Sequence, residues 1–298
     1  MRKAMILTLT LALLLGGCAQ KPPAVDTEPT AQVVETPRTW DYDLVTETET
    51  DEYYADDGTL LAAWSDEKPV LRMKSSAGET YQTGTDGVTE AQLAVCRAFN
   101  DGAAARAEDA RASWERLKAD ALEQYTEMGE EHRDLFETHT EDTTVSVTRR
   151  GELLEITEQM YGYWGGVHGG STFATLHFDL GAGEFLTLDD LSGDGAALRA
   201  AIVEDVTEQI YAQGLEEMCF DDFETLLGEM QDFTGTFGDE GLNLIFEQYA
   251  IAPYAAGVLE FTVPYARLSP LLNERALTLL AVPNEEKVLG EFDEAQGD

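Results

Sequence analysis

The sequence predicts an α+β fold: a mixed, largely antiparallel sheet with helices packed on it. Runs such as Thr143–Val147 and Leu242–Phe246 alternate apolar and polar residues, which is the pattern of a strand with one buried face. The pairs Asp57-Gly58 and Arg150-Gly151 interrupt such runs and are typical of turns between hairpin strands. One long stretch, Thr89–Tyr125, has apolar residues at helical spacing instead.

The first part of the sheet is expected in Trp40–Tyr54, which is rich in the Tyr, Thr and Val residues that favour strands. Leu60–Trp64 and Val70–Met73 would continue this sheet after the first turn. Thr89 and Gln92 have the spacing of a capping box, so we expect the long helix to begin there. Its apolar stripe would pack on the sheet.

The long helix carries one irregular segment, Asn100-Asp101-Gly102, where Gly102 is the place to expect any kink. Further along, the apolar residues of Ser171–Leu180 fall mainly on alternate positions, which places His177 on the opposite face of its strand. The other expected elements are a strand at Glu184–Leu188, helices at Leu198–Tyr211 and Phe220–Met230, a strand at Val258–Val263, a short helix at Pro264–Leu272 and a last strand at Leu277–Val282.

Residues 1–17 have the features of a lipoprotein signal peptide. Arg2 and Lys3 form a positive start, and the apolar run Ala4–Leu15 is too short to span a bilayer as a stable helix. The run ends in Leu15-Gly16-Gly17-Cys18, which resembles a bacterial lipobox. The resemblance implies a lipid on Cys18 and an anchor on the outer face of the cytoplasmic membrane. The alternative is an ordinary secretory signal with a chance cysteine.

The rest of the chain divides by composition. Residues 18–38 hold four prolines among polar residues and predict a disordered tether. We expect a strand-and-helix subdomain at residues 39–140, a second domain at 141–283 and an acidic tail at 284–298.

The formal net charge is −39, which excludes the electrostatic attraction that nucleic-acid binding needs. Such a surface attracts basic proteins, cationic peptides and metal cations. The plainer interpretation is a solvated acidic exterior that keeps an extracytoplasmic protein soluble.

Two cysteines remain once Cys18 is assigned to the lipid. Outside the membrane, Cys96 and Cys219 could form a disulfide that closes a long loop. Two buried free thiols are the alternative, and the sequence leaves both open.

No pattern of residues makes a case for catalysis. The chain lacks GxSxG, a P-loop, HExxH and an EF-hand loop, and its acidic pairs are expected by chance in so acidic a sequence. His168 and His177 with Asp179 are the best imaginable metal ligands, but structural histidines are the favoured interpretation. We therefore expect no enzyme activity, no cofactor and no metal site.

Candidate binding residues lie in two loops. The stretch Tyr161–Gly170 ends in a loop, residues 165–170, with four glycines in six positions. This density indicates unusual backbone conformations or a close approach of other atoms. The stretch Tyr249–Gly257 is an aromatic loop of the kind that serves recognition, although such rings also close the end of a core. The candidate binding residues are Tyr163, Trp164, Gly165, Gly166, His168, Gly169, Gly170, Tyr249, Pro253 and Tyr254.

Three segments together resemble a known family. Tyr161–Gly170, Phe178–Leu191 and Leu244–Tyr265 are similar to the extracytoplasmic RsiV-like domain of anti-sigma-V factors, some peptidoglycan deacetylases and many Gram-positive lipoproteins. In the best-understood branch of that family the domain is a receptor for lysozyme. The resemblance therefore implies a recognition domain, with Gly165-Gly166, His168-Gly169 and the Tyr249–Gly257 loop as its signatures.

These observations predict a lipid-anchored recognition module at the cell surface that binds a basic protein such as lysozyme. One alternative is binding of cell-wall glycan or peptide, that is peptidoglycan, through the aromatic residues. A wall-directed hydrolase is the least favoured alternative, because no catalytic constellation can be assembled.

Overall fold

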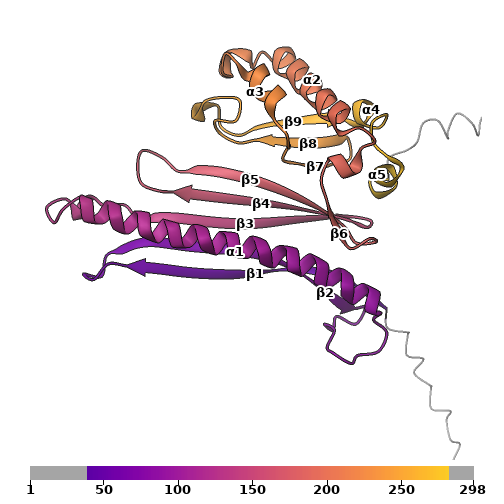
Figure 1. The fold of residues 1–298 in the computed structure, drawn as a ribbon, viewed down its shortest axis with the longest axis horizontal. Coiled ribbons are helices and arrows are strands. Elements are labelled where there is room, and N and C mark those ends of the chain that lie inside the picture. Colours follow the sequence, from indigo (N-terminus) through magenta and orange to yellow (C-terminus); the bar gives the residue numbers. More distant parts are fainter. Residues whose placement is uncertain (1–38, 282–298) are drawn as a thin grey trace, which may run out of the picture. The chain divides into compact units, whose positions relative to one another are not determined.

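The computed structural model describes residues 39–281, which contain a six-stranded and a three-stranded sheet (Figure 1). The predicted signal peptide, the lipid site at Cys18, the tether and the acidic tail lie outside the described residues. The longer elements are β1 (Trp40–Tyr54), β2 (Leu60–Ser75), α1 (Glu90–Glu127), β3 (His139–Arg150), β4 (Leu153–Tyr163), β5 (Gly170–Asp179), α2 (Gly195–Gln213), β8 (Gly241–Phe246) and β9 (Leu259–Pro264). The shorter ones are β6 (Glu184–Leu186), α3 (Phe223–Glu229), β7 (Gly235–Phe237), α4 (Tyr265–Leu268) and α5 (Glu274–Leu279).

The six-stranded sheet has the order β1-β2-β3-β4-β5-β6 and is antiparallel except where β2 pairs with β3. That parallel pair requires a crossover, and α1 provides it. The three-stranded sheet, β7-β8-β9, is antiparallel throughout. The predicted fold class is thus confirmed. The boundary expected at residue 140 falls inside β3, because the first sheet continues across it.

Helix α1 begins as predicted and runs without interruption through its irregular segment. The Thr89 side chain accepts a hydrogen bond from the backbone of Gln92, whose side chain accepts one from the backbone of Thr89. Asn100 turns its amide toward β2, where it accepts from the Leu71 backbone N–H and donates to the Leu71 carbonyl, both at 2.9 Å. The Asn100 side chain therefore satisfies the backbone groups of Leu71 in the way that a neighbouring strand would.

At Gly102, helix α1 packs directly against the Phe185 side chain of β6. A Cβ at this position would lie 2.3 Å from the ring of Phe185. The Phe185 ring cannot easily retreat, because it packs at centroid distances of 5.7 Å from Phe99 and 4.8 Å from Phe178. The glycine is thus a packing requirement.

We expect Gly102→Ala to lower the free energy of unfolding by about 1 kcal/mol. Overpacking costs about 1–3 kcal/mol, while the gain in helix propensity returns about 1 kcal/mol. Urea denaturation measures the difference. The control is Asp101→Ala, an exposed position in the same turn where only the propensity gain applies; equal stabilisation of both variants would contradict the packing argument.

Both faces of the six-stranded sheet carry a core. On the α1 face, Phe99 packs with Ile156 and Phe178 in one cluster, and a second cluster surrounds the stacked rings of Trp64 and Trp114. On the opposite face, the second sheet, α2 and α4 share a third cluster.

His177 lies on the face opposite the apolar residues of β5, as predicted, but that face is buried. His177 is 4% exposed and contacts Phe237 of β7, and its Nε2 lies 3.4 Å from Glu155 Oε1. Glu155 in turn accepts a 2.6 Å hydrogen bond from the backbone N–H of Phe237. This polar pair joins the two sheets.

Two expectations need correction or completion. Residues 277–279, predicted as the start of a last strand, are helical, because Asn273 caps α5 by accepting a hydrogen bond from Ala276 N–H at 2.9 Å. Strand β7 has only three residues, too few to show a period-2 pattern, and the sequence did not predict it.

Cys96 and Cys219 are free cysteines and form no disulfide with each other. Cys96 lies in the Phe99 cluster and Cys219 packs against the cluster of the second sheet. Burial raises the pKa of both thiols. Within residues 39–281, no helix combines the length and apolarity needed to cross a bilayer.

Candidate recognition surface

The two candidate loops come from different sheets and meet. One loop connects β4 to β5, and the other connects β8 to β9. The His168 ring stacks on the Tyr254 ring with centroids 3.8 Å apart and planes 17° apart. Tyr249 joins them, with its ring centroid 6.4 Å from that of His168 and its hydroxyl 3.4 Å from His168 Nε2. These three rings form a continuous cluster.

The β8–β9 loop holds its aromatic residues in an unusual backbone conformation. Tyr249 has a φ of 70°, which is rare for a bulky residue, and its N–H donates to the Ala252 carbonyl at 3.0 Å. Pro253 has the φ of −66° that its ring imposes and begins the short turn that carries Tyr254. Tyr249 thus has a costly backbone conformation and a side chain that is 57% exposed, and this combination makes it a candidate for binding.

The start of the β8–β9 loop is fixed to the edge of β5. Gln248 accepts a hydrogen bond from Ser171 N–H, and Glu247 accepts one from Phe173 N–H, both at 3.3 Å. The Thr234 hydroxyl donates to the Phe173 carbonyl at 3.3 Å. These side chains satisfy strand groups that no neighbouring strand pairs, and they set the loop beside His168.

Tyr163 and Trp164 do not join the three-ring cluster. Trp164 folds over Gly162, where a Cβ would lie 2.1 Å from the indole, and its Nε1 donates to Glu141 at 2.9 Å. The Tyr163 hydroxyl contacts the Glu137 carboxylate, which raises the pKa of Tyr163, and the Gly166 carbonyl at 2.9 Å. Tyr163 and Trp164 therefore line the base of the loop.

The glycines of the β4–β5 loop were expected to allow either unusual backbone conformations or a close approach of other atoms, and both occur. Gly165 and Gly166 have φ values of 79° and 112°, which side chains rarely adopt. A Cβ on Gly169 would lie 2.5 Å from the Gly162 carbonyl oxygen and 2.5 Å from the Tyr161 hydroxyl. Gly170 has open space around it, so no contact explains it.

Several large apolar side chains of these loops are exposed. Val167 is 96% exposed at the tip of its loop, and Trp164 is 42% exposed. We call Trp164, Val167, His168, Tyr249 and Tyr254 the aromatic surface. Apolar groups that gather in one patch mark interaction sites more often than scattered ones do, and within this surface the rings of His168, Tyr249 and Tyr254 form such a patch. Sequence reasoning included all of these residues except Val167, whose exposure no sequence signal indicates.

The other candidate groups have structural partners. Asp189 forms an ion pair with Arg199, and Asp190 accepts hydrogen bonds from both the backbone N–H and the hydroxyl of Thr187, which lowers the pKa of Asp190. His168 and His177 lie in different environments. Among residues 39–281, no group of three or more His, Cys, Asp or Glu side chains is arranged to hold a metal ion.

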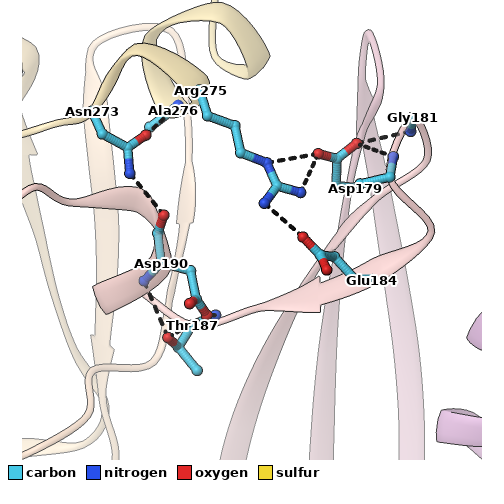
Figure 2. Close-up of polar contacts among 9 residues, drawn as sticks. Asp179, Gly181, Glu184, Thr187, Asp190, Asn273, Arg275 and Ala276 are labelled. Carbon is cyan, nitrogen blue, oxygen red and sulfur yellow. Dashed lines mark hydrogen bonds and ion pairs between the residues drawn. The ribbon is translucent and has the colours of Figure 1, made fainter.

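Arg275 links α5, the last helix in the described part of the chain, to the six-stranded sheet (Figure 2). Its Nε lies 2.9 Å and its Nη2 2.5 Å from the buried carboxylate of Asp179, and its Nη1 lies 2.6 Å from Glu184. Asp179 also accepts from the backbone N–H groups of Gly181 and Ala182. No local pattern of residues predicts this network, because Arg275 lies 96 residues from Asp179.

The chain is similar to proteins without an assigned activity. A family model described as "Protein of unknown function (DUF3298)" matches residues 189–266, which include the β8–β9 loop. A crystal structure of a member of this family from Bacteroides fragilis has a TM-score of 0.60 at 14% identity, covering 83% of this chain and 100% of that one. Another, from Pseudomonas aeruginosa, has a TM-score of 0.47 at 17% identity, covering 78% and 96%. No curated protein matches the chain. The first structure supports a shared fold.

Proposed function

We propose that this protein is an RsiV-like recognition module, lipid-anchored at the outer face of the cytoplasmic membrane, that binds a basic protein such as lysozyme. The observation that carries the proposal is the stacking of His168 on Tyr254. It brings together the Gly-rich loop and the aromatic loop, the two segments with the most specific resemblance to that family.

The charge of the protein suits a basic partner. A net charge of −39 accelerates the approach of a cationic protein and orients it before contact. Aromatic side chains that are already held by stacking lose little conformational freedom on binding, so they can supply affinity at short range. Steering and packing therefore make separable contributions, which differ in their dependence on salt.

Calorimetric titration of the full-length protein with hen egg-white lysozyme, at low and at physiological salt, tests the proposal. We expect one-to-one binding that persists at physiological salt, because packing contacts are not screened. Trp164→Ala should weaken it about tenfold, the effect of one half-exposed aromatic contact. Cytochrome c, another small basic protein, is the control.

Binding that disappears at physiological salt, or that cytochrome c reproduces, would contradict the proposal and reduce the acidic surface to a nonspecific attraction. Soluble peptidoglycan fragments would then be titrated in place of lysozyme. Stacking of sugars on Trp164 or Tyr254 is nearly independent of salt, so saturable binding of fragments in both buffers would favour the glycan alternative.

A further inference from the structure

A cavity of about 280 Å³ lies between α1 and the six-stranded sheet. Along this part of α1 the side chains that face the sheet are small, including Ala103, Ala107 and Ala110, so the helix does not fill the space. The cavity separates the Phe99 cluster from the Trp64 cluster, whose Trp64 ring forms part of its wall. Met160 and Ala174 of the sheet add further apolar surface.

Two buried carboxylates line this cavity. Asp66 is 8% exposed and Glu141 is 7% exposed. In the parallel pairing of β2 with β3, Asp66 is opposite Thr143 and Trp64 is opposite Glu141, so the two acidic residues are diagonal neighbours. Both are on the strand face that α1 covers.

These two carboxylates have only neutral hydrogen-bond partners. Glu141 accepts from the Ser113 hydroxyl at 3.1 Å and from Trp164 Nε1 at 2.9 Å. Burial raises the pKa of Asp66, and this effect outweighs the opposite effects of the Thr143 side chain and of the positive charges of Lys68 and Arg106. Neither forms an ion pair with any residue between 39 and 281.

The cations of the cavity do not neutralise its charge. Arg106 is engaged with Glu158, and Lys68 lies 4.0 Å from Glu47. The lining holds five carboxylates against these two cations: Asp66, Glu67, Asp109, Glu141 and Glu158. Buried negative charge that exceeds the positive charge around it is costly, and this excess favours the entry of a cation into the cavity.

We propose that the cavity binds an aliphatic ammonium group, such as the end of a lysine side chain, with the ammonium near Asp66 and Glu141. The three donors of an ammonium match the free acceptor capacity of two carboxylates, and a methylene stem matches the alanine and methionine walls. A metal ion is a poorer fit, because no group of three suitable ligands occurs among the described residues. The inference does not depend on lysozyme binding: the cavity adjoins the aromatic surface through the hydrogen bond from Trp164 to Glu141, but no residue of that surface lines the cavity.

The test is a titration of the full-length protein with Nα-acetyl-lysine amide, followed by calorimetry and by the fluorescence of its tryptophans, since Trp64 borders the cavity. Nα-acetyl-norleucine amide has the same stem without the charge, and we expect it to bind at least tenfold more weakly. Pentylamine shows whether the ammonium group belongs to a free amine or to a peptide. If pentylamine binds as tightly as the lysine amide, the ligand is a free amine, whereas tighter binding of the lysine amide indicates a peptide.

Two variants locate the binding. Asp66→Asn removes one carboxylate charge and should weaken the lysine amide at least tenfold. Ala107→Met fills the cavity and should abolish binding. Glu123→Gln makes the same charge change at an exposed position of α1 and should have no effect.

Equal binding of the norleucine amide would overturn the proposal, and so would equal losses in Asp66→Asn and Glu123→Gln. Thermal denaturation is recorded for each variant. If Ala107→Met fails to fold, the comparison of Asp66→Asn with Glu123→Gln decides.

Discussion

Tyr254→Ala is expected to lower the affinity of the full-length protein for lysozyme about 100-fold. The ring of Tyr254 provides the stack on which His168 rests, so the substitution removes one aromatic contact and releases a second. Aromatic residues at the centre of an interface typically contribute about 2–4 kcal/mol when truncated. A 100-fold loss corresponds to about 2.7 kcal/mol, within that range. Calorimetry at physiological salt measures it.

The matched control is Tyr211→Ala, because Tyr211 is 51% exposed on α2 and outside both loops. It should leave the affinity unchanged. Tyr254→Phe keeps the ring and should retain affinity within about threefold, since stacking rather than a hydroxyl contact is the postulated contribution. If Tyr211→Ala weakens binding as much as Tyr254→Ala, the aromatic surface is not the binding site.

The parts of the fold that the sequence predicted are those with local causes. The capping box at Thr89 and Gln92 is a contact between residues three apart, and residues that favour strands occur along the whole of Trp40–Tyr54. Strand β7 and helix α5 are short and repeat no signal, although Asn273 marks the start of α5 with a local cap. Their positions depend on tertiary contacts, Glu155 with Phe237 for β7 and Asp179 with Arg275 for α5.

The candidate site divides in the same way. The need for glycine at Gly165 and Gly166 is local, and the density of glycines in the sequence indicated it. The contact of His168 with Tyr254 joins two sheets, and no spacing in the chain predicts it. Trp164, another candidate binding residue, lies over Gly162, where the missing Cβ leaves room for the indole. The cavity beneath α1 was not foreseen, since its alanines also fit an ordinary helix interface.

Arg275→Met is expected to lower the free energy of unfolding by about 3 kcal/mol. The substitution keeps most of the apolar stem but leaves the Asp179 carboxylate, which is 5% exposed as a residue, without its cation. Removing one partner of a buried pair typically costs about 3–5 kcal/mol. We expect the lower end, because Gly181 and Ala182 still donate backbone hydrogen bonds to Asp179 and because Arg275 itself is partly exposed.

Urea denaturation of the full-length protein measures this loss, with Arg199→Met as the control. Arg199 also pairs with an aspartate, Asp189, but that carboxylate is 56% exposed, and exposed pairs contribute about 0–1 kcal/mol. The difference between the two variants therefore isolates burial of the carboxylate from the mere presence of an ion pair. Equal, small losses would mean that water replaces Arg275 at Asp179, and that α5 is held by its apolar contacts through Ala276 and Leu280 rather than by this network.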